Sequence, residues 1–73
     1  MRVNERDDEF CKEIGAKVRL ARNRAGLTQV QLSEMVKMKP ATLGNIENGH
    51  VAPHVTTLKQ IATALDKNVK DFL

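Results

Sequence analysis

The chain has 73 residues, 41% of them hydrophobic, and a net charge of +3 at neutral pH, which allows one small domain but not an additional ligand-binding domain. No apolar run approaches the ~20 residues of a membrane span, and Met1 is followed by charged residues rather than by a signal peptide. The single cysteine, Cys11, cannot form an intramolecular disulfide, so we expect a cytoplasmic protein without a membrane partner.

The first predicted element is a long helix. Residues 1–8 are polar and lack an apolar period, so we expect them to form a flexible arm before a single domain over residues 9–73. Apolar residues then recur at steps of three and four, which predicts a helix over residues 9–25. These residues are Phe10, Ile14, Val18, Ala21 and Ala25.

Local signals mark the start of a second helix over residues 29–36. Thr28 and Gln31 have the spacing of a capping box, in which each side chain binds the backbone N–H of the other residue. Gly26 stands where the preceding helix needs a left-handed residue in order to end.

A third helix is predicted over residues 40–48. Pro40 suits the first helical position, where no N–H is needed, and Asn48-Gly49 supplies a left-handed residue at the end. Two short helices joined by a tight turn form the helix-turn-helix arrangement, whose second helix enters the DNA major groove.

Two further helices complete the predicted fold. The spacing of Leu58, Ile61, Ala62 and Leu65 at i, i+3, i+4 and i+7 predicts a helix over residues 55–65. Asn68 and Asp71 resemble a cap that opens a short fifth helix. The expected fold class is therefore all-α, a compact domain of four to five helices.

The charge is uneven along the chain. Residues 1–13 carry three basic and five acidic residues, a balance of −2, whereas residues 14–73 carry nine basic and four acidic residues, a balance of +5. The basic part coincides with the helical domain, which suits a polyanion such as nucleic acid but also an ordinary solvated surface. No catalytic set, phosphate loop or metal-ligand spacing is present, so we expect neither an enzyme nor a cofactor or metal site.

From Ile14 onward the chain resembles the lambda-repressor-like, Cro/C1-type (XRE family) helix-turn-helix regulators of bacteria and phages. The matching segments are IGAKVRLAR (14–22), GLTQVQLSEMV (26–36), LGNIENG (43–49) and HVTTLKQIATAL (54–65). The resemblance implies a lambda-repressor-like fold and a sequence-specific transcriptional regulator or repressor that binds double-stranded DNA.

The resemblance also assigns the DNA contacts. The base-reading positions are Lys39, Pro40, Ala41, Thr42, Gly44 and Asn45. Asn45 has the geometry for a bidentate contact to adenine, but Pro40, Ala41 and Gly44 have no side-chain hydrogen-bonding group, so this surface is chemically sparse. The expected phosphate contacts come from Gln29, Arg22 and Lys37.

Arg22 and Glu47 are expected to form a structural ion pair. Glu47 lies near the negative end of the third helix, where a carboxylate needs a cationic partner, and relatives pair it with the arginine that matches Arg22. Lys37 stands where relatives commonly have glycine, and Lys39 stands where Ser or Thr usually caps the helix.

We also expect a homodimer, since one helix-turn-helix reads few base pairs. Its interface candidates are Val51, Val55, Val69 and Leu73, with Phe72 packed inward. An alternative function is a protein-binding helix-turn-helix adaptor or antirepressor-type module with little base reading. No small-molecule effector is evident from the sequence.

Overall fold

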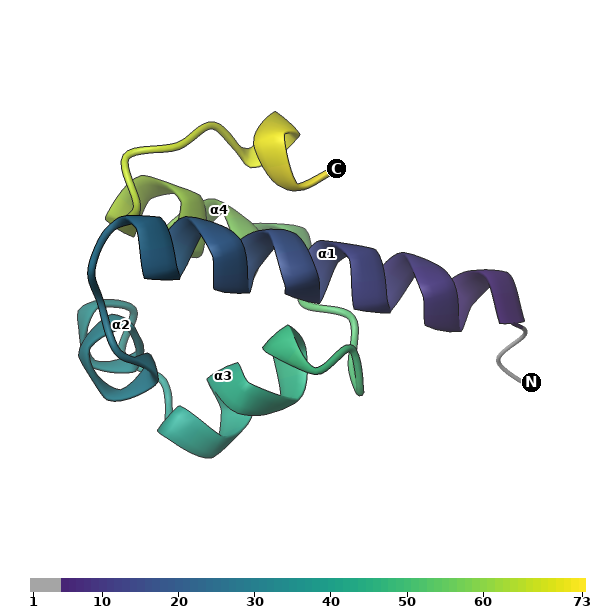
Figure 1. Cartoon of the computed structure of the whole chain (residues 1–73), viewed down its shortest axis with the longest axis horizontal. Coiled ribbons are helices and arrows are strands. Elements are labelled where there is room, and N and C mark those ends of the chain that lie inside the picture. The colour runs from purple at the N-terminus through teal and green to yellow at the C-terminus, as the bar shows by residue number, and fades with distance from the viewer. Residues whose placement is uncertain (1–4) are drawn as a thin grey trace.

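Five helical elements make up the described part of the chain. A computed structural model describes the backbone of residues 5–73 and the side chains of residues 8–73. The elements are α1 (Glu5–Arg24), α2 (Gln29–Met35), α3 (Pro40–Glu47), α4 (Val55–Ala64) and the 3-10 helix η1 (Val69–Phe72). With α1 along the long axis, α2 and α3 lie on one side of it and η1 on the other (Figure 1). The described residues form no strand, and the expected all-α fold class is confirmed.

The start of α1 differs from the expectation. This helix begins at Glu5 rather than at residue 9, so residues 5–8 of the expected arm form its first turn, and residues 1–4 lie outside the described residues. The helices α2, α3 and α4 each end one residue earlier than expected, and the omitted residue is the C-cap.

The predicted caps are confirmed. Thr28 Oγ1 accepts a hydrogen bond of 3.1 Å from the Gln31 N–H, and Gln31 Oε1 accepts one of 2.8 Å from the Thr28 N–H. Gly26 and Gly49 have φ angles of 75° and 76°, in the left-handed region that ends helices. Asn68 and Asp71 form a second capping box at the start of η1.

The core draws on every helix. Its buried side chains are Ile14, Val18, Leu32, Leu43, Ile46, Leu58, Ile61, Ala62, Leu65 and Phe72. Phe10 and Ala25 were expected on the inward stripe of α1, but both are exposed. Phe10 lies in the N-terminal part of α1, which extends beyond the rest of the domain (Figure 1), whereas Ala25 lies in the turn that follows Arg24, the last residue of α1. No helix of the described residues is long and apolar enough to span a membrane.

Gly15 allows a close approach between α1 and α3. A Cβ atom at this position would lie 2.3 Å from the backbone oxygen of Ile46 and 2.6 Å from that of Glu47. The end of α3 is therefore held against the backbone of α1, which fixes where the outer face of α3 points.

Candidate nucleic-acid interface

The turn between α2 and α3 contains a strained lysine. Lys37 has a φ angle of 56°, a left-handed conformation that costs a non-glycine residue about 1–2 kcal/mol. The turn is closed by the Met38 N–H, which donates to the Ser33 carbonyl oxygen at 2.9 Å. Lys39 is the N-cap of α3, and its side chain makes no capping hydrogen bond.

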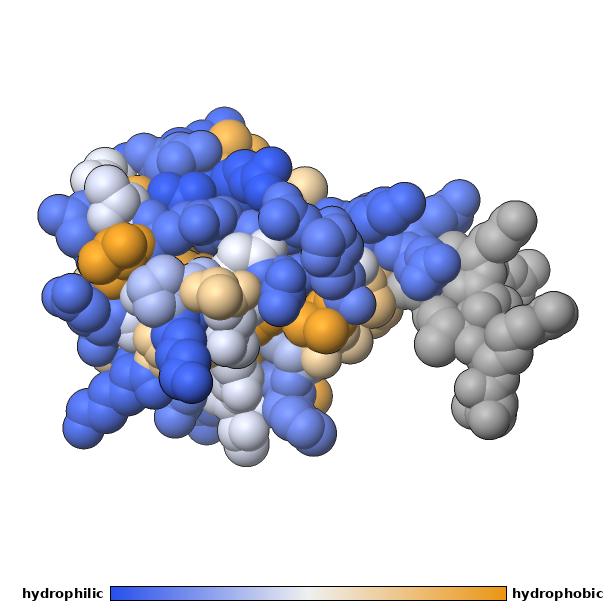
Figure 2. Space-filling model, turned by 90° about the horizontal axis from the view of Figure 1, so that it is seen from below, coloured by the Kyte–Doolittle hydropathy of each residue, from blue (hydrophilic) through white to orange (hydrophobic). Residues whose placement is uncertain are grey.

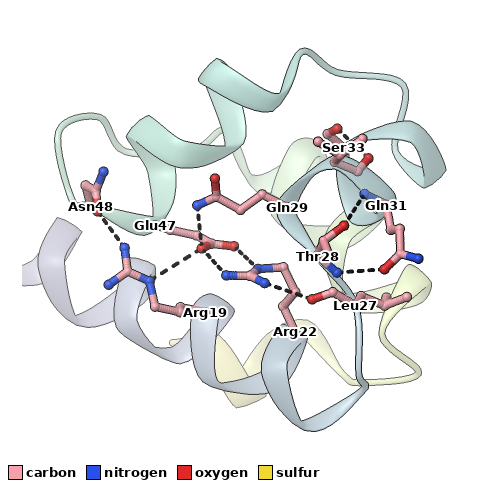
Figure 3. A network of polar contacts seen from close by, with 10 residues as sticks. Arg19, Arg22, Leu27, Thr28, Gln29, Gln31, Ser33, Glu47 and Asn48 are labelled. Carbon is pink, nitrogen blue, oxygen red and sulfur yellow. Dashed lines mark hydrogen bonds and ion pairs between the residues drawn. The ribbon is translucent and has the colours of Figure 1, made fainter.

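A buried ion pair joins the C-terminal end of α3 to α1. The Glu47 side chain has no exposed surface, and the Arg22 side chain is 10% exposed. Arg22 Nε donates to Glu47 Oε2 at 2.7 Å and Nη2 donates to Oε1 at 3.0 Å, while Nη1 donates to the Leu27 carbonyl oxygen at 2.8 Å (Figure 3). This two-pronged geometry is the strong form of an arginine–carboxylate contact.

The ion pair sets the charge state of both groups. Burial alone would raise the pKa of Glu47, but the hydrogen bonds from Arg22, Gln29 and Arg19 and the charge of Arg22 outweigh burial and hold this pKa below its usual value. The hydrogen bond to Glu47 raises the pKa of Arg22. Glu47 is therefore a carboxylate and Arg22 a cation at neutral pH.

Two further side chains converge on Glu47, and neither contact was predicted from the sequence. Gln29 Nε2 donates to Glu47 Oε1 at 3.0 Å, and Arg19 Nε lies 3.5 Å from the same oxygen (Figure 3). Arg19 Nη2 also donates to Asn48 Oδ1 at 2.5 Å. Arg19 therefore bridges α1 to the end of α3. The sequence signal that could have indicated this contact is the position of Arg19 on α1, one turn before Arg22.

The outer face of α3 is exposed while its inner face is packed. Leu43 and Ile46 are buried in the core. The proposed base-reading residues are exposed except for the half-buried Gly44; they are Lys39, Pro40, Ala41, Thr42, Gly44 and Asn45. The view from the side of α3 shows a largely hydrophilic surface with scattered apolar residues (Figure 2). Of these six residues, only Lys39, Thr42 and Asn45 have polar side chains.

Gln29 lies between the two helices of the motif. A Cβ atom added to Gly44 would lie 3.7 Å from Gln29 Oε1, so the start of α2 and the middle of α3 are neighbours. Lys37, the third expected phosphate contact besides Gln29 and Arg22, instead lines a groove between α2 and α4 together with Lys59. The structure thus brings Gln29, Arg22 and Glu47 together and places Lys37 apart from them.

The expected dimer residues differ in exposure. Val51, Val55 and Leu73 are 46%, 70% and 58% exposed, whereas Val69 is partly buried and packs against the core. Phe72 is buried, as expected. Among the described residues no group of three or more His, Cys, Asp or Glu side chains could hold a metal ion.

Comparison with known proteins identifies the family. The sequence model of the helix-turn-helix family HTH_3 matches residues 18–72. The chain belongs to the HTH_3 helix-turn-helix family. This membership confirms the resemblance to XRE-family, Cro/C1-type transcriptional regulators. No curated protein sequence matches the chain.

Solved structures share the fold of this HTH_3 protein. The restriction-modification controller protein C.AhdI from Aeromonas hydrophila is 24% identical, with a TM-score of 0.83 over 86% of this chain and 96% of that chain. The clp gene regulator ClgR from Corynebacterium glutamicum is 27% identical, with a TM-score of 0.84 over 86% of this chain and 67% of that chain. An HTH_3 family transcriptional regulator from Vibrio cholerae is 29% identical, with a TM-score of 0.84 over 90% of this chain but only 37% of the regulator.

Proposed function

We propose that the protein is a cytoplasmic transcriptional regulator that binds specific sites in double-stranded DNA with α3 in the major groove. The observation that carries this proposal is the fixed presentation of α3. Its outer face is exposed, while the buried Arg22–Glu47 pair and the close contact at Gly15 hold its inner face and C-terminal end. A rigidly held, solvent-facing second helix is what major-groove recognition requires. The experiment that tests this proposal is a binding titration of the protein with a duplex selected from a random pool.

Gln29 is the main proposed phosphate contact. As the first residue of α2 it stands where free backbone N–H groups and the positive helix end favour a phosphate. The side-chain amide nitrogen of Gln29 donates one hydrogen bond to Glu47. This contact fixes the amide and leaves its second N–H for the DNA backbone. Arg22 donates from all three of its nitrogens within the domain, so its role is mainly structural, and Lys37 supplies a further cation near the turn. Gln29→Ala is expected to weaken binding to all sequences by a similar factor.

Asn45 is the proposed base reader, supported by Lys39 and Thr42, while Pro40 and Ala41 offer only apolar contact, for example to a thymine methyl group. Asn45→Ala is expected to lose about 1–3 kcal/mol of binding on the selected site and little on unrelated duplexes. Asn23→Ala is the matched control, because Asn23 is an exposed residue on α1. Equal affinity of Asn45→Ala and the parent for the selected site would remove Asn45 as a reader.

Dimerisation would place two copies of α3 on one face of the DNA, about 34 Å apart. The exposed apolar surface for a two-fold contact comes from Val51, Val55 and Leu73. Val69, which is partly buried, contributes the part of its side chain that remains exposed. Such a small interface is expected to be weak without DNA, because little buried area offsets the entropy of association. A strict one-to-one complex on a palindrome long enough for two copies would contradict the dimer.

The alternative function is a protein-binding adaptor of the same fold. The observation in its favour is the scarcity of hydrogen-bonding groups on α3, where Pro40, Ala41 and Gly44 offer none from their side chains. Retention on duplex DNA separates the two functions, since phosphate contacts make it fall steeply with salt. Absence of retention even at low salt would favour the adaptor.

A further inference from the structure

An open groove lies between the C-terminal end of α2 and the outer face of α4. Its volume is about 600 Å³, within the size range of binding sites in proteins. Met35, Val36 and Ala64 give it an apolar lining, and Lys37 and Lys59 add two positive charges. Neither lysine forms an ion pair within the described part of the chain. The groove therefore suits a partner with an apolar anchor and negative charge.

The opposite end of the molecule has the complementary chemistry. The N-terminal turns of α1 extend beyond the rest of the domain, at the far end of the long axis from α2 (Figure 1). Phe10 is 48% exposed there, although a large aromatic side chain gains most when it is buried. Asp8, Glu9 and Glu13 are exposed around it, and none of the ion pairs in residues 8–73 involves them. We call Asp8, Glu9, Phe10 and Glu13 the acidic tip.

We propose that the acidic tip of one copy docks into the groove between α2 and α4 of a second copy, with Phe10 on the apolar lining and the carboxylates beside the two lysines. The occupant is a second copy of the chain, because the negative charges of the tip complement the two lysines of the groove. The tip and the groove lie at opposite ends of the domain, so a chain cannot fill its own groove. The contact joins two different surfaces and is therefore head-to-tail, which leaves a free tip at one end and a free groove at the other and allows the assembly to continue.

This contact is independent of the proposed two-fold dimer and of DNA binding. The proposed two-fold dimer uses Val51, Val55, Val69 and Leu73, and none of them lines the groove. A head-to-tail contact would link dimers, or single copies, into short rows. Charge pairs at its rim make it sensitive to ionic strength, since exposed charges are screened by salt.

The test measures self-association by sedimentation velocity at rising concentration and low salt. All variants are made in a background protein that carries Val55→Ser, a substitution expected to weaken the proposed two-fold dimer. Phe10→Ala and Lys59→Glu are each expected to lower the association constant at least about tenfold, since one removes the apolar anchor and the other reverses a charge in the groove. Lys67→Glu makes the same charge change outside this groove and is the matched control, expected to associate like the background protein.

Mixing the two impaired proteins gives the sharper result. The Lys59→Glu protein keeps its tip and the Phe10→Ala protein keeps its groove, so the mixture is expected to form a one-to-one complex and nothing larger. Combining Glu9→Lys with Lys59→Glu in one chain exchanges the charges and is expected to restore association. Circular dichroism checks that each variant is folded.

Three results would overturn the proposal. The first is a background protein that stays monomeric at every concentration. The second is weakened association in Phe10→Ala but unchanged association in Lys59→Glu, which would mean that the tips pair with each other. The third is a mixture of the two impaired proteins that stays monomeric.

Discussion

Loss of the Glu47 charge is expected to destabilise the domain strongly. Glu47→Gln leaves the Arg22 guanidinium, whose side chain is only 10% exposed, without its counter-ion. Breaking a buried pair by removing one partner costs about 3–5 kcal/mol. The glutamine oxygen can still accept one hydrogen bond, and Arg22 keeps its bond to the Leu27 carbonyl, so we expect about 3 kcal/mol. For a domain of this size that lowers Tm by about 12–24 °C.

Thermal unfolding followed by circular dichroism measures this change. Glu34→Gln is the matched control, because Glu34 is exposed on α2 and forms no ion pair with the described residues, and it should melt like the parent. A Glu47→Gln protein that melts within a few degrees of the parent would refute the argument. It would mean that the pair contributes no more than an exposed surface contact.

The pH dependence gives an independent check on the same residue. The folded-state pKa of Glu47 lies below its usual value, so its contribution to stability is present above the pKa of the unfolded carboxyl, about 4.3. That contribution is lost as the pH falls through the lower, folded pKa. The difference in stability between the parent and Glu47→Gln should therefore be constant near neutral pH and shrink in acid. A difference that stays constant down to the lowest pH at which the protein folds would argue against a carboxylate here.

Three further substitutions test the packing of the motif by their effect on the free energy of unfolding. Lys37→Gly should stabilise the domain by about 1 kcal/mol, because glycine adopts the left-handed conformation without strain, and an unchanged Tm would contradict this. Lys39→Ser should add about 1 kcal/mol by capping α3, and an unchanged free energy of unfolding would contradict this. Gly15→Ala should cost at least about 1–3 kcal/mol, since its Cβ would overlap the backbone of α3, and a gain in stability would show that the two helices can separate freely.

The local structure was predictable because short-range rules decide it. Three local features depend on residues two to five positions apart. They are the capping box of Thr28 and Gln31, the left-handed glycines Gly26 and Gly49, and the short helix after Asn68. The Arg22–Glu47 contact, although 25 residues apart in sequence, followed from an unfavourable charge at a helix end together with the family resemblance.

Contacts that depend on the relative placement of helices were not predictable. Arg19 and Gln29 reach Glu47 across 28 and 18 residues, and only the packing of α1, α2 and α3 brings them together. Phe10 continues the apolar period of α1, yet it is exposed because the helix is longer than the body it packs against. Periodicity shows which face of a helix is apolar but not how far along the helix that face is covered.

Competition between a selected duplex and a scrambled duplex of equal length and composition tests the central claim most directly. The account predicts that the protein prefers the selected duplex by about a thousandfold or more and that both affinities fall linearly in log–log plots against salt. It also predicts that Asn45→Ala removes much of the preference while Asn23→Ala retains it. Equal affinity for the two duplexes, or no binding to either at low salt, would contradict DNA recognition by α3.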